Sequence, residues 1–208
     1  MSVTLNTERK SPVNTRRFAI APLTSDTGAA LTYGAVKEWD KALISVKNTP
    51  KQNSATQYAS GQQIDGYVAK AGGTLDINVP ALTAQDEVDL FGSTFDSTSN
   101  TLASNKDDVI PYVMVIWSTA NSNGTINLHK CMKIKFQNGG DTVETSDDNG
   151  IKYQNVSLSG TYEPLIKTGD DIISIKGLDV SSAEGQAVET AWFAKALGGL
   201  NETKYPTT

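Results

Sequence analysis

The side chains with most potential for chemistry in this 208-residue chain are its single histidine and its single cysteine, two positions apart. His129 and Cys131 lie in a run that alternates apolar and polar residues, so a strand would place both on one polar face. Two ligands on one strand do not make a zinc site, because a structural zinc ion takes four. We therefore interpret both as ordinary strand residues.

No other pattern in the sequence supports an enzymatic function. Nucleophilic catalysis would need His129 as its base, and no serine stands in a GxSxG pattern. The acid pairs Asp107-Asp108 and Asp147-Asp148 could serve a glycosidase, but the aromatic platforms that hold sugars are sparse. The residues after Asp147 resemble a calcium loop without the glutamate it requires. We expect a protein that is not an enzyme and that needs no cofactor or metal.

Composition narrows the class of protein further. Hydrophobic residues make up 38% of the chain, and the formal net charge is −5. An acidic balance argues against sequence-independent binding of nucleic acid, which needs clustered Lys and Arg. No window approaches the roughly 18 apolar residues of a membrane-spanning helix, and the N-terminus lacks the apolar region of a signal peptide. We expect synthesis in a cytoplasm and no association with a membrane.

The elements that must position any functional surface are mainly strands. Alternating or continuous apolar patterns predict them at 18–23, 31–36, 42–46, 75–79, 109–117, 126–136, 156–162 and 172–175. Two helices are expected, one from the N-cap Thr83 to Gly92 and one from Ser181 to Gly199. The sum is a mainly β fold, a β-sandwich or open barrel with one or two flanking α-helices.

The stretch from Lys47 to Gly73 predicts a long loop between two strands. Hairpin connections normally need about 2–5 residues. The stretch is polar, with only isolated large apolar residues, and cannot bury itself. It is either disordered or ordered by a surface outside its own domain. We single out Lys47, Lys51, Tyr58 and Tyr67 as candidates for contact with a neighbouring subunit.

Three regions follow from these patterns. Residues 1–17 form an N-terminal arm, residues 18–199 the β domain, and residues 200–208 a flexible C-terminal tail. The arm carries four basic residues against one acid, Glu8. We single out Arg9, Lys10, Arg16 and Arg17 as candidates for contact with a partner.

The strand at 109–117 (VIPYVMVIW) is apolar on both faces, which predicts a central strand that is covered on both sides. Together with the long loop and the basic arm, it favours a self-assembling subunit. The other interpretations stay open: a doubly covered core strand, a disordered loop and a disordered tail.

Several segments, in order, resemble the major tail proteins of siphophages, and the phi13-type tail tube proteins in particular. They are Phe18-AIAPLTSDTGAALTYGAVKEWDKALISV, the polar run through Thr56-Gln-Tyr-Ala-Ser, Leu82-TAQDEVDLFG, Asp107-DVIPYVMVIW and Gly150-IKYQNVSLSGTYEPL. The resemblance covers roughly residues 18–163.

The resemblance implies the phage tail tube fold and a structural role in the virion. Six subunits would form a ring around an inner β-barrel, the rings would stack, and the viral genome would leave through the lumen. The basic arm would dock on acidic surface of an adjacent ring. An acidic lumen would let DNA slide without specific binding, and Asp76 is our candidate for a lumen-facing carboxylate. Tape-measure, distal tail and tail terminator proteins would be partners, with assembly in the host bacterial cytoplasm into the virion tail.

Two alternatives remain. The tube of a phage-derived contractile injection system shares the fold, and a neighbouring sheath gene would distinguish it. An Ig-like carbohydrate-binding or adhesion module would be a secreted monomer with exposed aromatic platforms.

Overall fold

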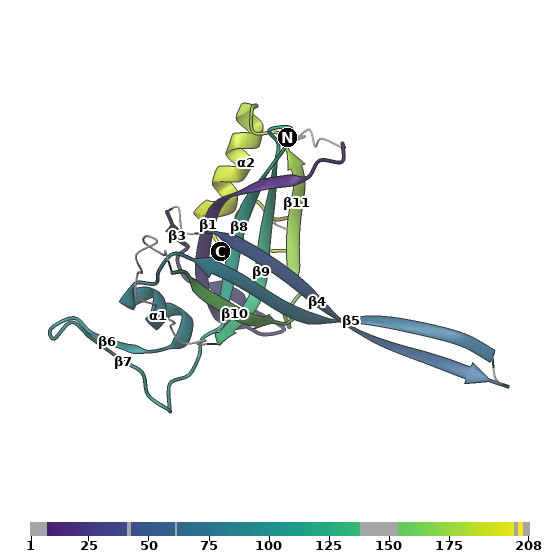
Figure 1. The fold of residues 1–208 in the computed structure, drawn as a ribbon, viewed down its shortest axis with the longest axis horizontal. Helices are drawn as coiled ribbons and strands as arrows, with labels where there is room; N and C mark the ends of the chain where they lie inside the picture. Colours follow the sequence, from purple (N-terminus) through teal and green to yellow (C-terminus); the bar gives the residue numbers. More distant parts are fainter. Residues whose placement is uncertain (1–7, 41–42, 61, 138–153, 202–203, 206–208) are drawn as a thin grey trace, which may run out of the picture.

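A computed structural model describes residues 8–40, 43–60, 62–137, 154–201 and 204–205 (Figure 1). The fold is mainly β with flanking helices, as predicted. The strands are β1 Pro12–Asp26, β2 Leu31–Tyr33, β3 Lys37–Trp39, β4 Ser45–Ala59, β5 Gln62–Val79, β6 Thr94–Asp96, β7 Thr101–Ala103, β8 Val113–Asn121, β9 Ile126–Gln137, β10 Val156–Tyr162 and β11 Ile172–Leu178. The helices are α1 Ala84–Phe91 and α2 Ala183–Ala194.

All strands except β6 and β7 belong to one antiparallel sheet in the order β2-β1-β8-β9-β10-β5-β4. Strand β3 also pairs with β1. One edge of β9 is shared, because its first half pairs with β11 and its second half with β10. The sheet therefore branches at β9, and its β10-β5-β4 part folds over the β1-β8-β9 part (Figure 1).

The first core lies between these two parts of the sheet. It contains side chains from all of their central strands, with α1 closing one side. The second core lies on the opposite face of β1-β8-β9-β11, beneath α2. Val113, Val115 and Trp117 enter the first core, while Met114 and Ile116 enter the second. The prediction of a central strand covered on both faces is confirmed for 113–117, whereas residues 109–112 precede the strand and Val109 is exposed.

Strand β9 departs from the simple alternation that the sequence predicts. Its register against β8 shifts between the pairs Val113–Ile134 and Val115–Cys131, so β9 carries one extra residue there. Such a bulge exchanges the two faces of a strand. Leu128 therefore lies in the second core, whereas Ile134 lies in the first. Cys131, expected on a polar face, is completely buried in the first core.

The predicted loop at 47–73 is wrong. This stretch forms the outer parts of β4 and β5, which pair from Ser45–Asn78 out to Ala59–Gln62. At the tip, Ser60 takes the left-handed conformation, with φ 51°. The hairpin leaves the body where Gly73 pairs with Tyr162 of β10. A Cβ on Gly73 would lie 2.5 Å from the Tyr162 hydroxyl oxygen of β10 and 2.5 Å from the Thr49 carbonyl oxygen of β4, so the hairpin can leave the body there only without a side chain.

The boundaries of the predicted N-terminal arm are also wrong. Strand β1 begins at Pro12 and pairs with the end of β8, so residues 12–17 belong to the sheet. A strand forms there because Asn14 and Thr15 have the edge of β8 as their partner. Residues 1–7 lie outside the described part of the chain.

The C-terminal segment is docked rather than flexible where it is described. Tyr205 is buried in the second core, and its hydroxyl donates a hydrogen bond to Asp170. The Lys204 ammonium lies 2.7 Å from a carboxylate oxygen of the same aspartate. The tail predicted at 200–208 is therefore anchored at these two residues.

The two helices begin and end for local reasons. Thr83 and Asp86 form a reciprocal capping box at the start of α1, and Gly92 ends it in the left-handed conformation. Ser182, one residue after the predicted cap, begins α2. Beyond the C-terminal end of α2, the buried Lys130 ammonium donates to the carbonyls of Ala196 and Gly198, at 2.7 Å each.

Candidate functional site

The histidine and the cysteine do not form a reactive pair. The His129 ring stacks on Trp117 with centroids 4.9 Å apart, and its Nδ1 lies 2.8 Å from the Ser174 hydroxyl. Burial and the charge of Lys176 lower the pKa of His129 to about 4, so it is neutral near pH 7. Burial raises the pKa of the Cys131 thiol, which removes its nucleophilic form. Both are structural residues in this fold.

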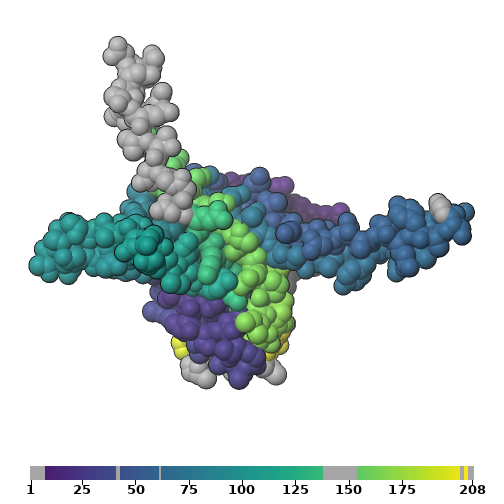
Figure 2. All heavy atoms as spheres, turned by 90° about the horizontal axis from the view of Figure 1, so that it is seen from below, coloured from purple at the N-terminus to yellow at the C-terminus, as the bar shows by residue number. Residues whose placement is uncertain are grey.

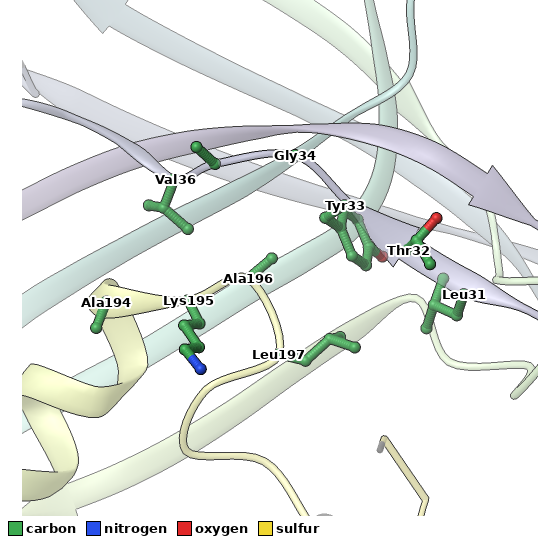
Figure 3. Close-up of a pocket in the computed structure, with 10 residues that line it drawn as sticks. Leu31, Thr32, Tyr33, Gly34, Val36, Ala194, Lys195, Ala196 and Leu197 are labelled. Atoms are coloured by element: carbon green, nitrogen blue, oxygen red, sulfur yellow. The ribbon is translucent and has the colours of Figure 1, made fainter. Parts of the chain in front are cut away.

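The remaining candidates for chemistry are dispersed. Asp108 accepts a hydrogen bond from the Asn105 N–H in a surface loop, while the second acid pair, Asp147-Asp148, lies outside the described residues. No group of three potential metal ligands occurs in the described part of the chain. A hollow of about 380 Å³ lies between residues 31–36 and the end of α2 (Figure 3). Its lining offers no carboxylate, imidazole or thiol.

The most distinctive surface is the β4–β5 hairpin, which projects from the body while the β6–β7 hairpin projects on the opposite side (Figure 2). Nine residues from Gln62 to Lys70 correspond to about 30 Å of strand. An isolated two-stranded hairpin is marginally stable in water. A second surface that covers a hairpin of this length would therefore stabilise it.

The hairpin carries exposed apolar side chains. Tyr58 is 66% exposed and Tyr67 is 69% exposed. Ile64 and Val68 are exposed as well. Half of the large apolar residues that the structure leaves exposed lie on this one element, and clustered exposure of this kind marks an interaction surface.

The predicted contact residues Lys47, Lys51, Tyr58 and Tyr67 all lie on the hairpin. Lys51 falls at the register shift between Pro50 and Gln52, at the base of the projecting part. The two tyrosines lie towards its tip, because Tyr58 pairs with Gln63 and Tyr67 with Ala55. Lys47 lies within the body of the sheet. The four residues therefore occupy two places, three on the projection and one at its root.

A second surface is the outer face of β10, β5 and β4, opposite the first core. It carries three cross-strand rows of polar side chains, and hydroxyl groups predominate. The rows are Thr49–Thr74–Thr161, Lys47–Asp76–Ser159 and Ser45–Asn78–Ser157. Asp76, our lumen candidate, is half-buried and accepts a hydrogen bond from the Ser159 hydroxyl at 2.6 Å. The Asn78 amide donates to the Ser45 hydroxyl at 2.7 Å.

The basic residues expected on the arm divide into two pairs. Arg17 makes a bidentate ion pair with Glu38, at 2.6 and 2.7 Å, and its guanidinium lies over the Phe193 ring. Arg16 lies 3.6 Å from a carboxylate oxygen of Glu189. Both arginines are therefore engaged within their own subunit, which makes them poor candidates for docking on a neighbour.

Arg9 and Lys10 differ in position, because both line a surface hollow at the end of the sheet, where they are exposed. Among the described residues, Lys10 pairs with the exposed Glu8, at 3.3 Å. Of the four predicted arm residues, these two lie on the hollow, whereas Arg16, although exposed, faces Glu189 of its own subunit.

The sheet also has open edges. Within the described residues, β4 pairs only with β5, and β2 and β3 pair only with β1. Unpaired strand edges are templates for pairing with another chain. The sheet has an open edge on each side, so the edge of one copy can pair with the other edge of the next copy in a head-to-tail arrangement.

No protein-family model matches this chain, and a comparison with curated proteins found no relative. No helix in the described residues is both long and apolar enough to cross a membrane.

Proposed function

We propose that this protein is a structural subunit of a phage tail tube, which assembles into stacked rings around a channel for the viral genome. The observation that carries the proposal is the β4–β5 hairpin, a projection with exposed apolar side chains and no covering surface among the described residues. A monomer gains nothing from such an element, whereas a neighbouring copy would bury it.

The two open sheet edges support a ring. A contact between different edges of identical subunits is heterologous, and heterologous contacts close into rings or extend into filaments. The body of the sheet would join the inner wall, and the hairpin would extend over an adjacent subunit. Tape-measure, distal tail and tail terminator proteins would then bound the tube in the virion.

The polar outer face of β10-β5-β4 suits the wall of a channel. Several of its polar groups bond to one another, as in the pairs Asp76–Ser159 and Asn78–Ser45. The lysine and the aspartate in its middle row oppose each other in sign, so the face offers no run of positive charge to hold DNA phosphates. In this proposal the channel wall is balanced in charge here, whereas the sequence alone predicts an acidic lumen.

The exposed tyrosines favour a second candidate, a carbohydrate-binding or adhesion module. Tyr58 and Tyr67 provide aromatic surface of the kind that stacks on sugar rings. That function predicts a monomer whose tyrosine fluorescence changes with oligosaccharides. A contractile-system tube makes the same structural predictions as the leading proposal and differs only in the presence of a sheath.

Electron microscopy of the concentrated protein by negative stain tests the proposal. We expect rings or hollow tubes, formed spontaneously or after addition of a tail initiator complex. Dispersed monomers in both conditions, together with saturable binding of oligosaccharide, would contradict the tube and establish the adhesion module.

A further inference from the structure

A cationic hollow lies at the end of the sheet where β8 ends and β9 begins. Its volume is about 580 Å³, and it is formed where residues 8–12 pass over the ends of β8, β9 and β11. Arg9, Lys10 and Lys176 supply its positive charges, and Asn121, Asn127 and His129 supply polar groups. We call these six residues the cationic hollow.

Among the described residues that line the hollow, positive charges outnumber negative ones. Three basic side chains stand against one carboxylate, Glu8, which is 3.3 Å from Lys10. The amides do not add charge, since Asn121 and Asn127 bond to each other at 2.9 and 3.1 Å. His129 is neutral near pH 7. The hollow is thus a locally positive site on a protein whose net charge is −5.

The segment that enters β8 at the opposite end is acidic. Strand β8 runs from that end to the hollow, and its nine residues span about 30 Å. Before β8 begins, the segment 94–110 carries Asp96, Asp107 and Asp108 against the single Lys106. Lys133 and Lys135 of β9 also lie at this end, so the negative charge belongs to the segment and not to the whole end. In Figure 1 the β6–β7 hairpin of this segment lies at the lower left, while the end of β11 beside the hollow lies at the top. The segment and the hollow therefore carry opposite charge at opposite ends of β8.

We propose that the cationic hollow receives the acidic 94–110 segment of a second copy, so that subunits stack head to tail along the direction of β8. The inference rests on the proposed tube and identifies its stacking contact. Opposite charges on opposite ends give every added copy the same orientation, and like ends repel. Arg16 and Arg17 lie outside the hollow and face Glu189 and Glu38 of their own subunit.

Charge reversal tests the contact. We expect Arg9→Glu with Lys176→Glu to leave rings intact but to shorten tubes by about tenfold or more, since each ring would meet a like-charged surface. Asp107→Lys with Asp108→Lys should do the same. A chain with all four changes should recover long tubes, because the charges are exchanged rather than lost. Lys195→Glu, an exposed reversal away from the hollow, is the matched control.

Normal tubes from either double variant, or no recovery in the fourfold variant, would overturn the stacking contact while leaving the tube intact. Absence of rings from the wild-type chain, both alone and with a tail initiator complex, would instead count against the proposed function. The hollow can still be tested in that case, because His129 is the only histidine and gives a unique imidazole NMR signal.

We expect the His129 signal to shift as the wild-type chain is concentrated to the millimolar range, and to stay unchanged in Asp107→Lys with Asp108→Lys. A signal that is constant for the wild type would overturn the proposal. A short DNA duplex is the second probe. A shift with duplex but none on self-association would assign the hollow to nucleic acid and likewise overturn it.

Discussion

Lys47 of β4 and Asp76 of β5 are direct register partners on the outer face of the sheet. From the sequence alone, Lys47 is predicted to lie at a contact between subunits and Asp76 to face a lumen. The pairing places both on one face. Whatever meets Asp76 in an assembly therefore also meets a lysine, so the pair rather than the carboxylate sets the local charge.

Reversal of the charge at Asp76 tests the assignment of this face to the channel. In Asp76→Lys, two lysines would be cross-strand neighbours, which lowers the free energy of unfolding by about 0.5 kcal/mol. If the face lines a channel, tubes of the variant should retain short duplex DNA that wild-type tubes do not. Co-sedimentation of labelled duplex with tubes at low salt measures this, and Lys195→Glu tubes provide a charge-change control. Equal retention by variant and wild type would place this face outside the channel.

The tyrosines of the hairpin should matter for assembly and little for folding. Because Tyr58 and Tyr67 are mostly exposed, their joint replacement by serine should change the free energy of unfolding by less than about 0.5 kcal/mol. Aromatic residues dominate the binding energy of interfaces, so the concentration needed for ring formation should rise by about tenfold or more. Sedimentation velocity measures the change.

Ile166→Ser is the matched control, because Ile166 is also highly exposed but lies outside the hairpin and outside the proposed stacking contact. It should assemble like the wild type. A serine double variant that assembles normally would remove the hairpin tyrosines from the interface.

The sequence predicts the body of this fold better than its projections. The apolar run from Val113 to Trp117 has one physical explanation, burial on both faces, and the structure agrees. The capping residues Thr83 and Gly92 are equally informative, because their backbone conformations are local properties. The bulge in β9 cannot be predicted from the sequence, because it depends on the register of a neighbouring strand.

The sequence contains a signal for the β4–β5 hairpin, although its polarity led to the prediction of a loop. Its residues are too polar to suggest a buried strand, and alternation alone carries no signal when both faces are exposed. The Ser60-Gly61 dipeptide at the middle of the stretch is a turn signal. It divides 45–79 into two halves that can pair with each other. Likewise, no sequence pattern indicates that Glu38 and Glu189 hold the arginines of β1, since those contacts join distant segments.

The buried ion pair between Asp26 and Lys133 should make the fold sensitive to acid. The two charged atoms are 3.0 Å apart, and both side chains are almost fully buried. Burial alone would raise the pKa of Asp26. The hydrogen bonds from the Ile166 N–H and from Lys133 outweigh it, so the pKa lies below its ordinary value of 3.8. Asp26→Asn should lower the free energy of unfolding at pH 7 by about 2 kcal/mol, because Lys133 loses one of its two carboxylate partners and keeps Glu163, 2.9 Å away.

A lowered pKa means that the carboxylate stabilises the fold fully above pH 3.8 and loses this effect as the pH falls through the pKa of the folded state. The difference between wild type and Asp26→Asn should therefore shrink in urea unfolding below about pH 4. Thr24→Val, a change on the exposed face of the same strand, serves as control. A difference that is constant from pH 7 to pH 3 would contradict the assignment.

The last prediction concerns a buried ammonium group, that of Lys130. Its ammonium has no exposed surface and lies 4.5 Å from the Trp192 ring centroid, in addition to its bonds beyond α2. In Lys130→Met the carbonyls of Ala196 and Gly198 lose their donor in a buried place. We expect a loss of about 2 kcal/mol at pH 7, with faster amide hydrogen exchange in α2.

The pH dependence separates the charge of Lys130 from its packing. Burial lowers the pKa of Lys130 to about 7 from its ordinary value of 10.5. Between these values the unfolded chain binds more protons than the folded chain, so the free energy of unfolding contributed by this group rises with pH and is flat below about pH 7. Urea unfolding of the wild type and Lys130→Met should therefore diverge from pH 7 to pH 10. Parallel curves would mean that the carbonyl contacts of Ala196 and Gly198 hold the ammonium charged in the folded state, and that its pKa is not lowered.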